Sequence, residues 1–360
     1  MTRGLLLERD AERQRMAGAL AEARAGRGSV LIVHGPAGIG KSSLLGAGID
    51  DAHDLGFLVA RAVGSELETE LALGVARTLA AALVAGAGDV DLGGSAARAH
   101  LLTQPTGKPT DAWAAIDGLH WLLARVAEHQ PVLVVVDDAH VADPPSQRAL
   151  GYLAARVADA AVVLAVAVRT GSGGTTPIAE RLLDLPDAIG IRPKSLSHRA
   201  VRLLVEHYLG TPASDSFVEA CRDATRGNPF LLNALLGELG AEEATPDDEH
   251  AARVARLAPP GVLRSIVLRL NRLGPDATAT AHALAVLGDA QPLPLLAQVS
   301  DLPVGVVEAA IDALVGADLV AQASGQAPVF AHPVVRSTLA RAIAGSARVT
   351  LHERAAAALT

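Results

Sequence analysis

Cysteine and aromatic side chains are nearly missing from this chain of 360 residues. It has one cysteine, Cys221, and phenylalanine, tryptophan and tyrosine together make up 2% of the sequence. A single cysteine excludes an intramolecular disulfide and favours a reducing compartment. Because apolar residues still make up 50% of the chain, we expect a large core built from alanine, leucine and valine.

Long hydrophobic runs and an excess of positive charge are missing as well. The longest apolar run, residues 160–168, is too short to span a bilayer, and the N-terminus returns to charged side chains after three leucines. The formal net charge of −8 argues against a broad basic surface for nucleic acid. We therefore expect a cytoplasmic protein with no secretory signal and no membrane partner.

A glycine-rich turn between a strand pattern and a helical pattern is the clearest motif. Residues 29–43 read SVLIVHGPAGIGKSS and fit G-x-x-x-x-G-K-[ST]. Glycines let the backbone approach phosphate oxygens, and N–H groups of the turn and the next helix point at the anion. Lys41 adds a cation for the β- and γ-phosphates, and the Ser42 hydroxyl is a ligand for Mg²⁺. The motif predicts a P-loop, with nucleotide contacts from Gly35, Pro36, Ala37, Gly38, Ile39, Gly40, Lys41, Ser42 and Ser43.

A second strand pattern ends in two carboxylates. Residues 132–140 read VLVVVDDAH, and in P-loop folds an aspartate at the carboxyl end of such a strand reaches the Mg²⁺ shell. We assign Asp137 to the metal shell together with Ser42, and Asp138 to orienting or activating the attacking water. The alternative, a strand end capped by surface acids, is disfavoured by the P-loop upstream.

A cation follows the next apolar strand pattern, residues 162–168. Arg169 at that edge could sense the γ-phosphate, and a solvated strand-end arginine is the alternative. The predicted catalytic set is therefore Lys41, Asp137, Asp138 and Arg169.

Strand-length apolar runs alternate with helical patterns in the first half of the chain. The runs are residues 30–33, 57–63, 132–136, 162–168 and 188–192. Continuous apolar strands that alternate with helices predict an α/β fold with a parallel sheet covered on both faces. Residues 89–110 are rich in glycine and polar side chains and are expected to form a long surface loop.

Helical patterns replace the strand signals in the second half. Serine or asparagine caps are predicted to begin helices at residues 197–209, 214–224 and 228–239, the last with proline at its first position. Residues 241–250 carry five acids and are expected to be a solvated linker.

The C-terminal region combines helical patterns with a short β-rich stretch. Helices are expected at residues 262–273, 276–287 and 304–314 and from residue 333, and strands at 319–323 and 329–331. Three helices with a small hairpin are typical of a winged helix. We therefore predict a P-loop domain (1–195), a helical domain with its acidic linker (196–258) and a winged-helix-like domain (259–360). The last helical pattern has no stop signal, so we expect a truncated helix.

Together these motifs resemble those of STAND-class NTPases, and most closely the N-terminal ATPase region of large LuxR-type transcriptional regulators. The similar segments are LLERDAE, GPAGIGKSS, LVVVDDAHVAD, the strand end at Arg169, RGNPFLL and FAHPVVRSTL, in the family's order and over nearly the whole chain. The P-loop and the acid pair are common to P-loop NTPases, whereas GNPF and FAHPVVR narrow the resemblance to this family.

The resemblance implies nucleotide contacts outside the P-loop, with ATP or ADP and Mg²⁺ as cofactors. Leu7 and Arg9 would lie near the adenine and ribose, although Glu8 stands where the family often has a glycine. Pro229 would pack on the base, and His332 would reach the β-phosphate of ADP and hold a closed state. The alternative for Pro229 is an ordinary proline at a helix start, and the alternative for His332 is an ordinary histidine at a helix cap.

The predicted function is an ATP/ADP-binding switch with slow Mg-dependent hydrolysis, the regulatory NTPase module of a LuxR-type transcriptional regulator. An inducer or protein partner would favour exchange of ADP for ATP and permit self-association. The family's C-terminal helix-turn-helix has no counterpart here, so no direct DNA binding by this chain is expected. The alternative is a freely turning-over AAA-type ATPase that acts as an oligomer, with Arg148 or Arg156 as a candidate arginine finger in trans.

Overall fold

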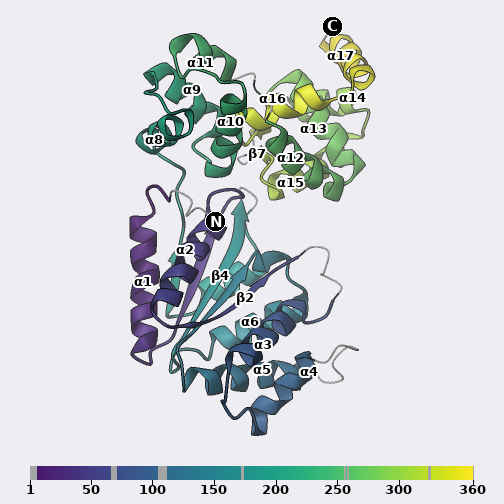
Figure 1. Cartoon of the computed structure of the whole chain (residues 1–360). Helices are drawn as coiled ribbons and strands as arrows, with labels where there is room; N and C mark the ends of the chain where they lie inside the picture. Colours follow the sequence, from purple (N-terminus) through teal and green to yellow (C-terminus); the bar gives the residue numbers. More distant parts are fainter. Residues whose placement is uncertain are drawn as a thin grey trace. The chain divides into compact units, whose positions relative to one another are not determined.

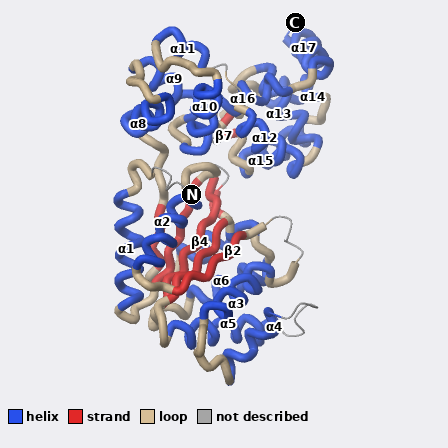
Figure 2. The backbone as a smooth tube through the Cα atoms, in the orientation of Figure 1, coloured by secondary structure: helices blue, strands red, loops and turns tan. Residues whose placement is uncertain are grey.

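The computed structural model describes residues 6–65, 71–103, 112–171, 174–254, 257, 259–322 and 326–359. The chain forms two compact units, the first mainly from residues up to Pro193 and the second mainly from Lys194 onward. Figure 2 shows that the long strands belong to the first unit, whereas the second consists mainly of helices.

The first unit is built on a parallel sheet (Figure 1). Its strands are β1 (Ser29–Gly35), β2 (Leu58–Val63), β3 (Val132–Asp137), β4 (Val162–Gly171) and β6 (Ala188–Ile191), in the order β2-β3-β4-β1-β6. All four pairings along this order are parallel, and the short β5 (Gly174–Thr175) pairs with β4. The predicted α/β fold with a parallel sheet is confirmed, and each predicted run coincides with one of these strands.

Helices cover both faces of this sheet. One face carries α1 (Asp10–Arg24) and α2 (Lys41–Asp54), and the other carries α3 (Gly74–Gly86), α5 (Ala112–Ala127), α6 (Pro144–Ala154) and α7 (Pro177–Leu183). Along β3, Val132, Val134 and Val136 belong to one core, and Leu133 and Val135 belong to the other. The central strands β1, β3 and β4 are buried on both sides, which is why they read as continuous apolar runs, whereas Arg61 and Val63 of β2 are exposed.

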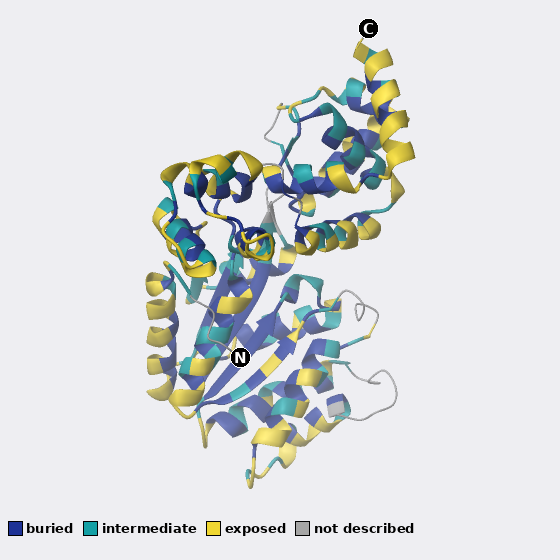
Figure 3. Cartoon of the chain, turned by 45° about the horizontal axis from the view of Figure 1, so that its top comes forward, coloured by how far each residue is buried: buried dark blue, intermediate teal, exposed yellow. Residues whose placement is uncertain are grey.

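Aliphatic side chains fill these cores, as the composition predicted. Figure 3 shows that the central strands of the sheet are mostly buried. The two tryptophans do not contribute to the deep core, since Trp113 is 64% exposed and Trp121 is 45% exposed.

The segment predicted as a long surface loop is partly helical, so this prediction was wrong for its second part. The 3-10 helix η2 (Gly94–Ala99) and the short α4 (His100–Thr103) precede α5, and residues 104–111 lie outside the described residues. Ala96, Ala99 and Leu102 are buried and recur every three residues. They give the segment an apolar side that packs near α5, which the many glycines and polar residues obscured.

The second unit begins with three helices at the predicted caps, α8 (His198–Leu209), α9 (Asp215–Thr225) and α10 (Pro229–Ala241). The hydroxyl of Ser197 accepts from the third N–H after it, as does that of Ser214. The side chain of Asn228 accepts from two backbone N–H groups, and Pro229 begins α10. These predictions are confirmed because the caps act over only a few residues.

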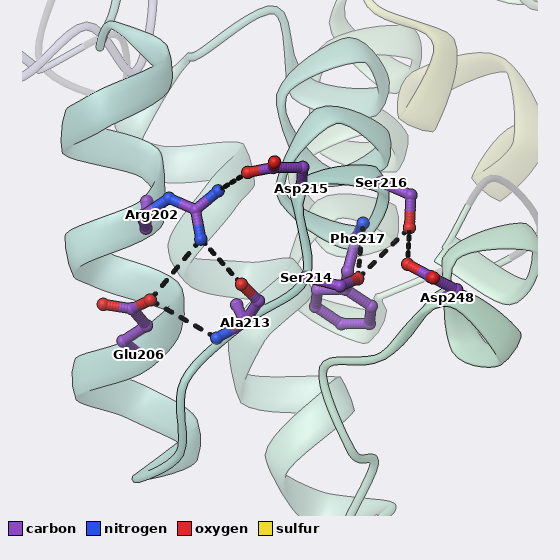
Figure 4. A network of polar contacts seen from close by, with 8 residues as sticks. All are labelled: Arg202, Glu206, Ala213, Ser214, Asp215, Ser216, Phe217 and Asp248. Carbon is purple, nitrogen blue, oxygen red and sulfur yellow. Dashed lines mark hydrogen bonds and ion pairs between the residues drawn. The ribbon is translucent and has the colours of Figure 1, made fainter.

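Part of the predicted acidic linker, residues 241–250, is helical instead. α11 (Asp248–Val254) begins within it, and polar contacts join this helix to α9 and α9 to α8 (Figure 4). Arg202 of α8 pairs with Asp215, the first residue of α9, and Ser216 donates a hydrogen bond to Asp248. Acids in a first helical turn interact favourably with the helix dipole, so the acidic run was compatible with a helix start.

The rest of the second unit consists of helices and a two-stranded antiparallel hairpin. The helices are α12 (Pro260–Leu273), α13 (Pro275–Leu287), α14 (Leu293–Ser300), α15 (Val304–Gly316), α16 (Pro333–Ala342) and α17 (Gly345–Leu359), and the hairpin pairs β7 (Val320–Ala321) with β8 (Val329–Phe330). Sequence analysis missed α14, whose prolines at 292 and 294 occupy its N-cap and first turn, where proline is tolerated. In the described part of the chain, no helix has the length and apolar character needed to cross a membrane.

Replacing Leu164 of β4 with alanine should destabilise the first unit. Leu164 is 1% exposed in the middle of the sheet, so truncation leaves a cavity and an expected loss of about 2–5 kcal/mol. Leu71→Ala in the same unit is the matched control, because Leu71 is 60% exposed and its loss should cost only about 0.5 kcal/mol. Urea unfolding followed by circular dichroism measures both, and equal midpoints for the two variants would contradict the prediction.

Candidate functional site

Predicted site residues from three strands meet at one edge of the sheet. Parallel pairing places Gly35, the last residue of β1, opposite Arg169 of β4. The neighbouring strand β3 ends at Asp137. Because the carboxyl ends of parallel strands lie at the same edge, the start of the P-loop, the acid pair and Arg169 are brought together as predicted.

The P-loop turn leads from β1 into α2. Gly38 and Gly40 have φ angles of 75° and 101°, in the left-handed region that glycine adopts without strain. Lys41 is the first residue of α2 and is 7% exposed, and its Nζ donates to the carbonyl oxygen of Gly35 at 2.9 Å. Ser42 and Ser43 are exposed in the first turn of α2. The helix N-terminus, the ammonium group and the hydroxyls thus form a cradle suited to an anion.

The two aspartates of the pair have different surroundings. Asp137 is 6% exposed, and its Oδ1 accepts from the backbone N–H of Asp138 at 3.0 Å. The Asp138 side chain is 43% exposed and its φ is 48°. The chain after β2 passes so close to this turn that a Cβ at Gly64 would lie 2.2 Å from the Asp138 carbonyl oxygen. The turn therefore requires a glycine at position 64, which sequence analysis did not single out.

The oxygen ligands that this edge of the sheet offers are suited to Mg²⁺. The described residues contain no group of three or more histidine, cysteine, aspartate or glutamate side chains that could form a complete protein cage for a metal. Mg²⁺ instead takes one or two protein carboxylates together with water and substrate phosphates. Asp137, buried with Oδ1 hydrogen-bonded, and the exposed hydroxyl of Ser42 match that requirement.

His140 was missed by sequence analysis, although it ends the VLVVVDDAH segment. Its side chain is 8% exposed, and its Nδ1 accepts from the backbone N–H of Arg169 at 3.4 Å. Burial, and then the positive charges of Arg169 and Lys41, lower the pKa of His140 to about 4, against the opposing charge of Asp137. The ring is neutral near pH 7 and connects the turn after β3 with the end of β4. The only signal in the sequence was a polar residue two positions after the acid pair.

Arg169 lies at the predicted strand end with a half-buried side chain. Its Nε is buried and has no hydrogen-bond partner among the residues that the structure describes. A guanidinium with an unused donor at this edge is suited to contact a phosphate oxygen.

Asp143 is a second buried carboxylate that sequence analysis did not assign. It is 2% exposed, caps α6 by accepting from Ser146 N at 2.9 Å, and accepts from Leu73 N at 2.8 Å and Gly74 N at 3.0 Å. Leu73 has a left-handed φ of 63° just before α3. Asp143 therefore fixes the start of α3 to the start of α6, and its role is structural.

The LLERD segment places a buried cation at the start of α1. Arg9 is 3% exposed, and burial lowers its pKa against the opposing effects of Glu12 and Glu8. Glu8 has a φ of 55°, a conformation that favours glycine, which gives a physical reason for the glycine common at this place in the family. Leu7 is half-buried. The contact of Leu7 and Arg9 with a base or ribose stays a prediction.

Pro229 and His332 lie in the second unit, at the starts of α10 and α16. Burial foremost, together with the charges of Arg226 and Arg269, lowers the pKa of His332 to about 4, whereas a hydrogen bond with the backbone of Thr225 raises it. Nδ1 of His332 is buried and has no hydrogen-bond partner within the described residues. The nucleotide contacts of both residues stay predictions.

Part of the chain matches a known protein family. Residues 5–166 match the family model of the AAA ATPase domain. This segment, which includes the P-loop, the acid pair and His140, is similar to AAA ATPase domains. Among proteins of curated function, none matches the chain in sequence.

Solved structures share the fold at low sequence identity. A Walker-type ATPase of Pyrococcus abyssi is 14% identical with a TM-score of 0.58, over 93% of this chain and 96% of that one. The ORC1 protein of Aeropyrum pernix, solved in complex with DNA, is 18% identical with a TM-score of 0.52, over 94% and 93%. A STAND protein with a tetratricopeptide repeat sensor from Pyrococcus horikoshii is 15% identical with a TM-score of 0.43, over 98% and 45%. The first two show that the chain has the fold of P-loop ATPases.

Replacing Asp143 with asparagine should destabilise the first unit without abolishing nucleotide binding. The change removes a charged acceptor and directs an amide N–H₂ towards backbone donors, for an expected cost of about 1–3 kcal/mol. Asp159→Asn is the control, because Asp159 is exposed in the same unit. Urea midpoints and nucleotide titrations measure the two effects, and an Asp143→Asn protein as stable as the control would contradict the structural role.

Proposed function

We propose that this chain binds ATP and ADP with Mg²⁺ and hydrolyses ATP slowly, as a switch of the STAND kind. The observation that carries the proposal is the gathering of Lys41, Asp137 and Arg169 at one edge of the sheet, beside the P-loop turn. The match of residues 5–166 to the AAA ATPase domain supports it.

Each group at this edge has a role that follows from its surroundings. Lys41 and the N-terminal N–H groups of α2 hold the phosphates. Asp137 and Ser42 hold Mg²⁺, which neutralises charge on the phosphate oxygens when bound. The exposed carboxylate of Asp138 orients the attacking water, and Arg169 contacts the γ-phosphate.

Slow hydrolysis is expected because the candidate arginine fingers give little sign of that role. The guanidinium of Arg156 lies 3.7 Å from the ring centre of Tyr152 and donates to the carbonyl oxygen of the same residue at 3.2 Å. Arg148 is an exposed residue of α6. An arginine finger typically raises the rate by about 10³–10⁵, and among the described residues neither candidate makes a contact that marks it as one, which favours a switch over a motor.

The second unit supplies the proposed latch. A β-phosphate beside His332 would favour the protonated ring, so that Nδ1 gains a hydrogen to donate to the anion. Arg226 and Arg269, whose charges act on this ring, would favour the same anion. Pro229 would pack on the base. In this proposal ADP holds the closed state, and ATP releases the winged-helix-like domain, residues 259–360, and permits self-association.

The regulatory role rests on the GNPF and FAHPVVR segments, which resemble those of LuxR-type regulators. We assign the chain as the cytoplasmic NTPase module of such a regulator, controlled by an inducer or protein partner, with no direct DNA binding of its own. The alternative remains an AAA-type ATPase that turns over freely as an oligomer.

The nucleotide that copurifies with the protein tests the switch. Acid release should yield stoichiometric ADP from the wild type, and Lys41→Ala and His332→Ala should both lose it. His282→Ala is the matched control, since His282 is another partly buried histidine of the second unit and has no proposed ligand. An empty protein that hydrolyses added ATP at a rate rising with protein concentration would favour the oligomeric ATPase. An empty protein that binds no ATP would reject the proposal.

The pH dependence of ADP affinity tests the His332 latch. The pKa of His332 is about 4 without nucleotide, and a nearby phosphate raises it, so binding takes up a proton at pH values between the free and bound pKa. ADP affinity should therefore rise as the pH falls towards about 4, the pKa of His332 in the free protein, and His332→Gln should reduce this slope. Calorimetric titrations at several pH values measure the effect. Parallel profiles for wild type and variant would speak against the latch.

A further inference from the structure

The imidazole of His140 has one nitrogen in use and one without a partner. Nδ1 accepts from the backbone N–H of Arg169 at 3.4 Å, so it carries no hydrogen. The hydrogen of the neutral ring is therefore on Nε2. That atom is buried and has no hydrogen-bond partner among the described residues. A buried donor without a partner is costly, and this one calls for an acceptor oxygen.

The surroundings of the ring identify the chemistry of that acceptor. The side chain is 8% exposed, so the ring is largely shielded from bulk water. The charges that act on its pKa come from Lys41, Arg169 and Asp137, which belong to α2, β4 and β3 at the same edge of the sheet. The carboxylate of Asp138 lies 3.9 Å from Nδ1, on the side of the ring away from Nε2. Two cations around a neutral donor favour an anionic oxygen, and Lys41 marks the place of the β- and γ-phosphates in a P-loop.

We propose that His140 donates a hydrogen bond from Nε2 to an oxygen of the γ-phosphate and so distinguishes ATP from ADP. The inference deepens the proposed function and rests on its nucleotide binding. Because Nδ1 holds the backbone of Arg169, the same ring connects the γ-phosphate to the end of β4. Binding of the third phosphate would thus act, through His140, on the part of β4 that carries the Arg169 side chain.

A purely structural histidine would behave differently. To hold the N–H of Arg169, the side chain needs only an acceptor near the position of Nδ1, which asparagine also supplies through Oδ1. The donor at Nε2 contributes nothing to that contact. Glutamine has the opposite property, because its longer side chain carries an amide N–H₂ near the position of Nε2. The two substitutions separate the γ-phosphate contact from the positioning of Arg169.

The contact of His140 with the γ-phosphate is tested by titrating nucleotide-free protein with ADP and with a non-hydrolysable ATP analogue. His140→Asn should bind the analogue about tenfold or more weaker than wild type, with ADP affinity changed by less than about twofold. His140→Gln should regain analogue affinity to within about threefold of wild type. His282→Asn, a histidine of the second unit, should change neither affinity. Thermal melts establish that each variant is folded.

The possible results separate the inference from the proposed function. A His140→Asn protein that still prefers the analogue as wild type does, or that loses both affinities equally, would overturn the γ-phosphate contact. Wild-type protein that binds neither nucleotide would instead overturn the proposed function, and the inference with it. If His140→Asn does not fold, nitrogen-15 NMR of the wild-type histidines decides, with His140→Gln for assignment. The Nε2–H signal of His140 should shift with the analogue and not with ADP, and an unchanged signal would overturn the inference.

Discussion

The parallel pairing of β4 with both β1 and β3 is the constraint on which the site depends. It places Gly35 opposite Arg169 and brings the end of β3 beside them. A slip of one residue would move Arg169 by about 3.3 Å and turn its side chain to the other face of the sheet. The register is well specified, because alternate side chains of each strand are buried in different cores, as with Ile32 on one face and Leu31 on the other. Packing far from the edge thus sets the geometry at the edge.

The site concentrates charges that packing alone would not favour. Lys41 and Asp137 are almost fully buried, and both have hydrogen bonds that lower the cost of burial. His140 avoids a further buried charge, since its neighbours and its burial keep the ring neutral. The buried donors of His140 and Arg169 that lack partners among the described residues remain available for a ligand. Such a combination is expected where function, rather than stability, has determined the residues.

The second unit is stabilised by helix caps and by contacts between helices rather than by a large sheet. Its helices begin at local caps, and short polar contacts such as Arg202 with Asp215 and Ser216 with Asp248 join consecutive helices. Its long aliphatic helices need few aromatic residues, and Phe217 is among the largest side chains that are fully buried. His332 differs from these residues, whose polar groups are paired. It is a half-buried, neutral histidine whose buried Nδ1 has no partner in the described structure, and it lies close to basic groups of the same unit.

The sequence by itself determined the features that depend on residues close together in the chain. The apolar runs of β1, β3 and β4, the glycines of the P-loop, and the caps at Ser197 and Asn228 were all predictable, because burial on both faces, left-handed turns and capping act within a few residues. The tertiary structure alone decided that His140 accepts from Arg169 and that Asp143 accepts from Leu73 and Gly74. These contacts join residues far apart in the chain, and no local pattern specifies such a partner. For the same reason η2 was taken for a loop, since its helical turns are stabilised by packing near α5 rather than by their own composition.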